Sequence, residues 1–195
     1  MAPAGTKKRH HHGNLERALV EAGIELLSEG GHSALTLRKC AARAGVSHAA
    51  PAHHFDGLKG LLTAIVTEGF KTFTQSMIEQ RDAAATDPHA RLVAVCNGYL
   101  KFSKDNEAMA ALMYMTDEIF TGNPEFQSAA AASYQVLADA CAPFTSGAAG
   151  RKGTEVLIWS LVQGYASLAR SGQSDAEETP FADILPLLDL QVREN

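Results

Sequence analysis

The chain has 195 residues, enough for one domain of ordinary size or for a small and a medium module that share a core. Apolar residues make up 46% of the sequence, Ala is frequent and β-branched runs are scarce, so the composition favours a helical protein with a buried core. The net charge of -5 argues against nucleic acid for the chain as a whole, and no apolar stretch reaches the ~18 residues of a membrane span.

Four helices are predicted in the first part of the chain, after a small, polar and basic stretch, residues 1–13, that is expected to form a flexible arm. Each helix follows a residue that can cap its first turn. The capping residues are Asn14, Thr36, Ser47 and Asp56. The predicted helices cover residues 14–30, 37–44, 47–55 and 57–81.

Five further helices are predicted after residue 81. Asp87-Pro88 and Asn123-Pro124 each combine a cap with a proline at the first helical position. The first of these helices stops near residues 104–106, before a short helix that contains Met109, Leu112 and Met113, and the second reaches about Cys141.

After a loop over residues 143–150, the apolar run Val156–Ala169 keeps helical spacing. It therefore predicts a long, almost fully buried helix rather than a strand. Thr179-Pro180 opens a last helix through Leu190. The fold class expected is all-α, with about nine helices and no strands.

Charge is distributed unevenly along the chain. Residues 1–62 carry eight basic and five acidic residues, a net charge of +3, whereas the remainder carries nine basic and seventeen acidic residues, a net charge of -8. Seven of the eight histidines also lie in the first segment. This asymmetry indicates a basic contact module joined to an acidic body.

Three distant cysteines without a CxxC motif indicate neither a zinc knuckle nor a disulfide framework. The first residues, MAPAGTKKRHHHGN, lack the apolar region of a signal peptide. We therefore expect a cytoplasmic protein with reduced thiols and no cofactor or metal.

Residues 36–62, TLRKCAARAGVSHAAPAHHFDGLKGLL, contain a helix, a tight glycine turn and a second short helix. Ala41 and Ala42 are small where two helices must cross closely. Gly45 supplies the turn and Val46 fills the gap between the helices. This arrangement is typical of a helix-turn-helix, whose second helix enters the major groove of DNA.

The same segment resembles the DNA-binding domain of the tetracycline-repressor (TetR) family. The matching positions are Thr36, Ala42, the turn Ala44–Ser47, His54-Phe55, Lys59 and Leu61-Leu62. One branch of that family is resembled further, through HHGNL at His11–Leu15 and SHAAP at Ser47–Pro51. That branch carries a Trp-x-x-x-His-Gly signature in its C-terminal domain, which Trp159–Gly164 matches except that Gln163 replaces His.

The resemblance covers the whole chain and is most specific over residues 14–66. It implies a DNA-binding domain at 14–60, after the arm at 1–13, and a ligand-binding and dimerisation domain at 61–195. Two departures matter. Ala52 stands where the family usually has Tyr, so a phosphate or stacking contact is lost and His53 is a partial replacement. Gln163 puts a ligand role for its position in doubt.

Eight residues are expected to contact DNA, some at phosphates and some at bases. The expected phosphate contacts are Thr36, Arg38, Lys39 and Lys59, with a solvated helix face as the alternative for Arg38 and Lys39. The residues expected near bases are Ser47, His48, Ala49 and His53. The recognition helix has no Arg or Lys, so phosphates, and Lys7, Lys8 and Arg9 in a minor groove, are expected to carry much of the affinity.

Phe55 is expected in the core, and His54 is expected to pack or cap at a helix end. The resemblance implies a homodimer joined by the last two long helices, with the helices of Trp159 and of Leu185 and Leu188 as candidates. It also implies a pocket among the middle helices for a small apolar or aromatic effector. The candidate pocket residues are Tyr99, Phe102, Met109, Met113, Tyr114, Phe120, Trp159 and Gln163.

The function expected is a regulator, most simply a repressor, that binds a palindromic operator as a dimer and is released by the effector. One alternative is a helical adaptor that has lost DNA binding, in view of Ala52 and the weak recognition helix. Another is a metal-dependent enzyme with a site at His10–His12, although adjacent histidines in a flexible arm lack fixed geometry. That histidine run is interpreted as native, with a purification-tag remnant as the alternative.

Overall fold

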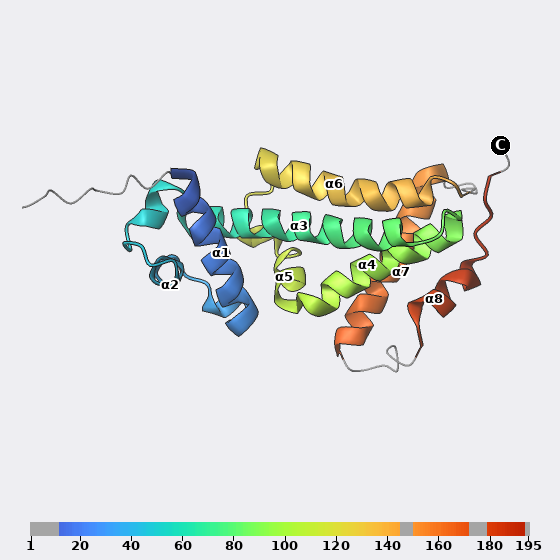
Figure 1. Ribbon diagram of the computed structural model, residues 1–195, viewed down its shortest axis with the longest axis horizontal. Helices are drawn as coiled ribbons and strands as arrows, with labels where there is room; N and C mark the ends of the chain where they lie inside the picture. Colours follow the sequence, from blue (N-terminus) through green and yellow to red (C-terminus); the bar gives the residue numbers. More distant parts are fainter. Residues whose placement is uncertain (1–11, 145–149, 172–178, 194–195) are drawn as a thin grey trace, which may run out of the picture.

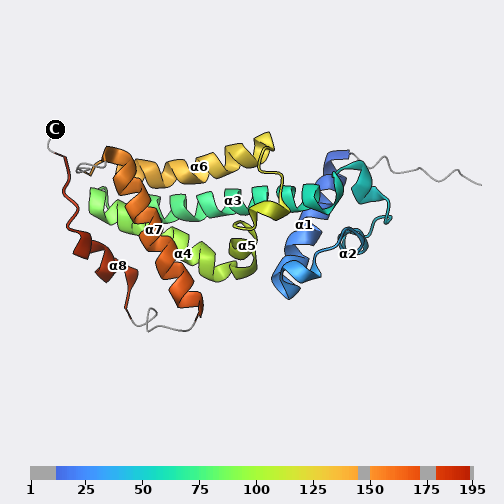
Figure 2. The same ribbon diagram turned by 180° about the vertical axis from the view of Figure 1, so that it is seen from behind.

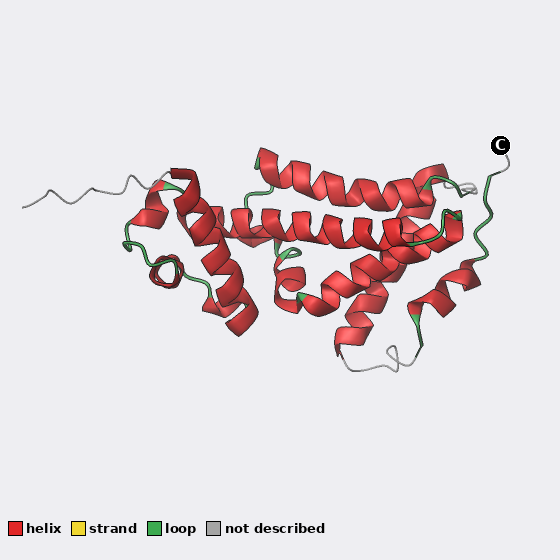
Figure 3. Cartoon of the chain, viewed as in Figure 1, coloured by secondary structure: helices red, strands yellow, loops and turns green. Residues whose placement is uncertain are grey.

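The computed structural model describes residues 12–144, 150–171 and 179–193, in which helices are joined by loops and turns (Figures 1 and 3). The α-helices of this part are α1 (His12–Gly30), α2 (Leu37–Arg43), α3 (Gly57–Ala83), α4 (Pro88–Asp105), α5 (Glu107–Leu112), α6 (Pro124–Cys141), α7 (Gly150–Ser171) and α8 (Phe181–Ile184). Short 3-10 helices cover His32–Ala34, Ala50–His53, Thr116–Glu118 and Leu185–Leu188. The all-α prediction is confirmed, and β-pairing in these residues is limited to an isolated bridge between Phe144 and Val192.

Helix α3 is the axis of the molecule. It leaves the small group formed by α1, α2 and the Ala50–His53 turn, and then runs along the larger group of helices (Figure 1). There α4 and α6 pack along it, α7 crosses α4 and α6, and α8 lies at the edge near the C-terminal end (Figures 1 and 2). One helix therefore belongs to both parts of the chain.

Two apolar clusters hold these groups together. The first joins α1, α2 and the start of α3 to α5, and it includes Leu19, Cys40, Phe55 and Ile65. The second joins the end of α3 to α4, α6, α7 and α8. Phe55 is thus in the core, as predicted. Because α5 contributes to the first cluster, the small and large groups of helices share buried surface and are not connected through α3 alone.

The closest helix crossing lies between α3 and α4 at Gly98. A Cβ atom on Gly98 would lie 2.5 Å from Met77 Cα and 2.6 Å from the Ser76 carbonyl oxygen. The Ser76 hydroxyl donates a hydrogen bond of 2.9 Å to the Gly98 carbonyl oxygen at the same point. The sequence needs glycine here because two backbones meet where a side chain would otherwise stand.

Most predicted helix starts are present with their caps. The side chain of Thr36 accepts from Lys39 N–H, that of Asp87 from Ala90 N–H, and that of Asn123 from Glu125 and Phe126 N–H. Helix α1 begins at His12, two residues before the expected Asn14 cap, since neither His12 nor Gly13 prevents a helical backbone. Residues 1–11 of the predicted arm, with His10 and His11, lie outside the described part of the chain.

Besides the Asn14 cap, which lies inside α1, two further predicted caps are wrong, at Ser47 and Asp56. Ser47 was expected to cap an α-helix to Phe55, but the segment forms turns and the 3-10 helix Ala50–His53. Pro51 has no N–H to donate to the Ser47 carbonyl oxygen, and Ala50 N–H bonds it instead at 3.0 Å. Asp56 makes no side-chain bond to α3, because Gly57 turns the chain with a φ of +68°.

The last helix is also shorter than predicted. It was expected to run to Leu190, but α8 ends at Ile184 and a 3-10 turn follows to Leu188. Pro186 lies in that turn, lacks an N–H and cannot extend an α-helix. Leu185, which identifies one helix of the expected dimer interface, is buried against the second cluster of its own chain.

Helix α7 is present where predicted, but it is not almost fully buried within one chain. Ile158, Val162 and Ala166 are buried against the second cluster. On other sides of the helix, Val156 is 58% exposed and Leu168 is 52% exposed. The prediction was based on apolar residues around the whole circumference of the helix, but a single chain buries only one face of the helix.

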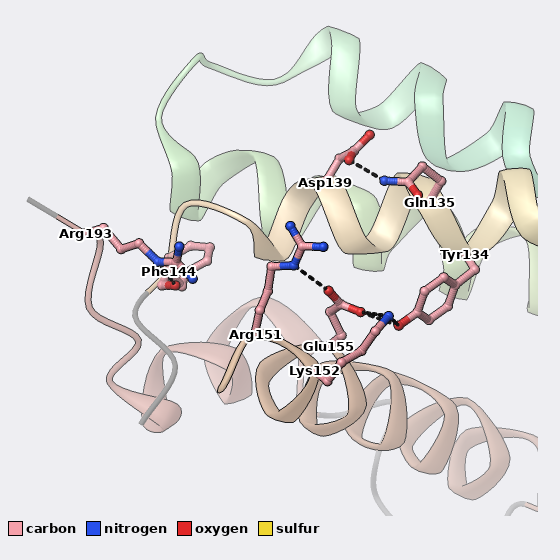
Figure 4. A network of polar contacts seen from close by, with 8 residues as sticks. All are labelled: Tyr134, Gln135, Asp139, Phe144, Arg151, Lys152, Glu155 and Arg193. Carbon is pink, nitrogen blue, oxygen red and sulfur yellow. Dashed lines mark hydrogen bonds and ion pairs between the residues drawn. The ribbon is translucent and has the colours of Figure 1, made fainter. Parts of the chain in front are cut away.

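A polar network fastens the start of α7 to α6 (Figure 4). The carboxylate of Glu155 is buried and accepts hydrogen bonds from the Tyr134 hydroxyl and from the Lys152 ammonium, the latter at 2.7 Å. Arg151 adds an ion pair at 3.3 Å. The hydrogen bonds from Lys152 and Tyr134 hold the pKa of Glu155 below its ordinary value.

Within the described residues, no helix is long and apolar enough to cross a membrane.

Candidate DNA-binding surface and ligand cavity

The helix-turn-helix forms as the sequence predicts up to its second helix. Helix α2 ends at Arg43, and Gly45 takes a left-handed backbone with φ +67°. The chain then reverses, and Val46 N–H donates to the Ala41 carbonyl oxygen at 3.0 Å. Val46 is half-buried against the first cluster, while Ala41 is fully buried. The turn therefore presents residues 47–53 on the surface at a fixed angle to α2.

An ion-pair cluster that the sequence analysis did not consider fixes α2 on α1. The Arg43 guanidinium donates to Glu29 at 2.6 and 2.9 Å and to Glu25 at 3.0 Å. The hydrogen bond from Arg43 lowers the pKa of Glu29, and these acidic partners raise that of Arg43. Arg43 is thereby engaged within the protein, which distinguishes it from Arg38 and Lys39 on the same helix.

All eight residues predicted to contact DNA are exposed at this end of the molecule. They are Thr36, Arg38, Lys39, Ser47, His48, Ala49, His53 and Lys59. The Thr36 oxygen accepts from Lys39 N–H at 3.2 Å, which leaves the hydroxyl hydrogen available to a phosphate. His54, by contrast, is half-buried next to Phe55, with 6.5 Å between ring centroids.

Lys59 has protein contacts that the sequence did not indicate. Its ammonium donates to the Asp117 carbonyl oxygen at 2.9 Å and lies 5.3 Å from the centre of the Phe120 ring. Close by, Phe120 N–H donates to the Thr63 hydroxyl at 2.9 Å. The segment between α5 and α6 is therefore bound to the first two turns of α3, beside the predicted DNA contacts.

A cavity of about 140 Å³ lies in the larger group of helices, enclosed by α3, α4, α5, α6 and α7. Its wall is almost entirely apolar and aromatic. The lining residues are Phe70, Phe73, Met77, Tyr99, Phe102, Ser103, Ala110, Met113, Tyr114, Ala130, Ser133, Tyr134, Leu137 and Trp159. Tyr114 and Trp159 are the most exposed of them, which indicates an opening between α5 and α7.

Five of the eight candidate pocket residues line this cavity: Tyr99, Phe102, Met113, Tyr114 and Trp159. The other three do not. Met109 is buried in the first cluster, where its sulfur lies near Gly69. Phe120 lies beside Lys59, and Gln163 lies one turn beyond Trp159 on α7 without reaching the cavity wall.

Aromatic side chains set the shape and polarity of the cavity. Phe73 packs edge-on against Tyr99, with 5.0 Å between ring centroids, and contacts Phe102 at 5.1 Å. The hydroxyls of Tyr99 and Tyr114 share a hydrogen bond of 2.7 Å. Burial, and then the neighbouring Tyr114, raise the pKa of Tyr99, so its hydroxyl stays neutral and can bond a ligand.

Helices α3 and α6 also contribute to the cavity wall, and these contributions were not predicted from the sequence. Phe70, Phe73 and Met77 have helical spacing on α3, and Ser133, Tyr134 and Leu137 have it on α6. That spacing was visible in the sequence. It does not separate a cavity wall from ordinary core, because both require one apolar face on a helix.

Comparison with family models gives two matches. The model described as "Bacterial regulatory proteins, tetR family" matches residues 19–65. The model described as "Tetracyclin repressor-like, C-terminal domain" matches residues 92–194, just over half of the chain. No curated protein matches the sequence.

Solved structures with the same fold include a protein of unknown function from Rhodococcus sp. RHA1. It is 26% identical, with a TM-score of 0.76 over 94% of this chain and 95% of that one. The multidrug binding protein EbrR, complexed with imidazole, is 17% identical, with a TM-score of 0.67 over 100% of both chains. FadR from Bacillus subtilis, in complex with stearoyl-CoA, is 15% identical, with a TM-score of 0.60 over 88% of this chain and 94% of that one.

Proposed function

The chain belongs to the TetR family of transcriptional regulators, and from that premise we propose that it is a repressor. It binds a palindromic operator as a homodimer and leaves the DNA when a small molecule enters the cavity. We assign DNA binding to residues 14–60, and effector binding and dimerisation to residues 61–195. The observation that carries the proposal is an exposed helix-turn-helix and a lined cavity, which are joined by helix α3 and by the segment between α5 and α6.

The DNA-binding half of the proposal depends mainly on phosphate contacts. The segment after the turn is only one 3-10 turn long and carries no Arg or Lys. Its exposed His48 and His53 supply base contacts that are weaker than an Arg–guanine pair. Thr36, Arg38 and Lys59 supply phosphate contacts, which fix the register of the protein on the duplex.

The effector half of the proposal has a physical route from the cavity to the DNA. Tyr114 in the cavity wall shares a hydrogen bond with Tyr99 and lies near the start of the segment between α5 and α6. Through Asp117 and Phe120, that segment contacts Lys59. The Asp117 carbonyl oxygen occupies one of the three N–H donors of this ammonium and so influences where the others point toward a phosphate. A ligand that moves Tyr114 therefore changes how readily Lys59 binds DNA.

The dimer is proposed to form through the exposed face of α7 together with the neighbouring α6. Val156, Leu157 and Leu168 are exposed apolar residues of α7. Ser160 and Gly164 lie between them on the same side, and a Cβ placed on Gly164 would meet no described atom within 4 Å beyond its chain neighbours and the backbone of its own helix turn. A second helix could approach closely there and bury the apolar residues.

Fluorescence anisotropy with DNA from upstream of the protein's own gene tests the proposal. We expect tight, saturable binding that competitor DNA of random sequence does not abolish, and loss of binding when a cavity ligand is added. An adaptor without DNA binding is the second outcome to distinguish, because the recognition segment is short and Ala52 replaces the family's usual Tyr. Such an adaptor would show only weak binding that is equal for all sequences.

A further inference from the structure

A second hollow adjoins the cavity and has a different character. This polar hollow has a volume of about 490 Å³ and lies between the end of α4, the start of α5, the last two turns of α7 and α8. Ser103 on α4 lines both the polar hollow and the cavity. The two spaces are therefore neighbours, with the buried Ser103 in the wall of each.

The wall of the polar hollow is cationic. Its charged members are Lys101, Lys104, Arg170 and Glu107. Residues 63–195 carry a net charge of -8. Three basic residues around one hollow are therefore unusual in this acidic part of the chain. Lys101 is paired with Asp105. Among the residues that the structure describes, no carboxylate forms an ion pair with Arg170.

Helix α7 connects the two spaces along one face. Trp159 in the cavity wall and Arg170 in the polar hollow are eleven residues apart, which is three turns and about 16 Å along the helix axis. Gln163 and Ala166 lie between them at the fourth and seventh positions, on the same side. An aromatic side chain, an amide and a guanidinium thus follow one another along a single line.

The charge of Arg170 also reaches the cavity. Burial and Tyr114 raise the pKa of Tyr99, and the positive charge of Arg170 acts on that hydroxyl in the opposite direction.

We propose that the effector is an amphipathic anion, whose apolar end occupies the cavity and whose acidic group binds Arg170 in the polar hollow. This inference rests on the proposed function, since it names the class of the effector. A cavity of about 150 Å³ accommodates benzene, so the apolar end has the size of one aromatic ring or a short acyl chain. A planar guanidinium binds a carboxylate or a phosphate through two parallel hydrogen bonds, which selects an anionic over a neutral head group.

The test uses 4-phenylbutyrate and its neutral analogue 4-phenyl-1-butanol, with binding to the full-length protein measured by calorimetry without DNA. Wild type should bind the acid about ten-fold more tightly than the alcohol, the low end for a hydrogen bond to a charged group at a partly exposed site. Arg170→Gln should remove that preference and leave the affinity for the alcohol unchanged. Arg91→Gln, an exposed arginine at the other end of α4, is the matched control and should retain the preference.

A second variant tests whether the apolar end of the ligand lies in the cavity. Ala130→Val narrows the cavity from α6 and should weaken binding of the acid and the alcohol equally, with circular dichroism as the check on folding. Equal affinities of wild type for the two probes, an unchanged preference in Arg170→Gln, or binding of neither probe at millimolar concentration would overturn the proposal. A carboxylate preference together with unaltered DNA binding in the presence of the acid would keep this site and refute the repressor proposal instead.

Discussion

At the scale of single residues, Lys59 is where the proposed route from the ligand cavity meets the predicted DNA contacts. It was expected at a phosphate, and in the free chain it donates to the Asp117 carbonyl oxygen. Both partners are oxygen acceptors at an exposed ammonium, so the bond to Asp117 is exchangeable. Lys59 therefore differs from Arg38 and Lys39, because its ammonium already donates a hydrogen bond to the protein before DNA binds.

Replacing Lys59 with Ala should weaken binding to every DNA sequence by a similar factor. The dependence of the logarithm of affinity on the logarithm of salt concentration should flatten by about one unit per half-site, because one phosphate contact is lost in each. Anisotropy titrations at several salt concentrations measure both quantities. Thr36→Ala should weaken binding without changing the salt slope, since a hydroxyl carries no charge.

Lys71→Ala is the control for the Lys59 variant. Lys71 lies on the same helix, α3, is exposed and pairs with Glu68, away from the predicted DNA contacts. Its removal should leave both the affinity and the salt slope unchanged. Identical salt slopes for wild type and Lys59→Ala would show that Lys59 stays on Asp117 when DNA binds.

Glu155 gives a prediction about pH. Its pKa in the folded protein is lowered, chiefly by the hydrogen bond from Lys152, so its ionised form stabilises the fold above the ordinary pKa of 4.5. That contribution is lost as the pH falls below 4.5 toward the lowered value. Glu155→Gln should therefore unfold at lower urea concentration than wild type at pH 7, and the gap should narrow between pH 4.5 and pH 3. A gap that stays constant over this range would show that the charge of the Glu155 carboxylate does not stabilise the fold.

At the scale of elements, caps and prolines decided which helices the sequence could predict. Asp87-Pro88 and Asn123-Pro124 gave the starts of α4 and α6, because a capping oxygen and a fixed φ act locally. Pro51 and Pro186 each remove a backbone N–H donor inside a predicted helix. The recognition segment and the last helix are shorter for that reason.

The crossing of α3 and α4 predicts that Gly98→Ala is strongly destabilising. The new Cβ would meet Met77 and Ser76 backbone atoms, which cannot move aside, so we expect a loss of about 1–3 kcal/mol. Gly69→Ala is the comparison, because its Cβ would meet the flexible side chain of Met109. Urea denaturation should give a clearly smaller loss for Gly69→Ala, and the reverse order would mean that the crossing can open.

The exposed face of α7 predicts which residues hold the dimer. Leu168→Glu places a charge in the proposed interface and should give monomers in sedimentation velocity, with weak operator binding. Leu187→Glu is the control, since Leu187 is 81% exposed but lies in the turn after α8. A monomeric Leu187→Glu protein beside a dimeric Leu168→Glu protein would move the interface to the C-terminal turn.

At the scale of the whole molecule, the sequence predicted the fold class and the exposed DNA-binding end well, since periodicity and turn residues act over short distances. The cavity was predicted only in part. Its wall draws on five helices, and no local pattern says that Phe70 faces a cavity while Met109 fills the core. The contact of Lys59 with Asp117 spans 58 residues and depends on the path of the segment before α6.

The most direct test of a dimeric repressor is selection of binding sites from random duplex DNA by the full-length protein, followed by mass determination of the complex. A dimeric repressor is expected to select a palindrome whose half-site centres lie about 34–36 Å apart or a multiple of that, with chains bound in pairs, because two symmetric helix-turn-helix units must reach successive major grooves. Enrichment of one unrepeated half-site bound by a single chain, or no enrichment at all, would contradict it.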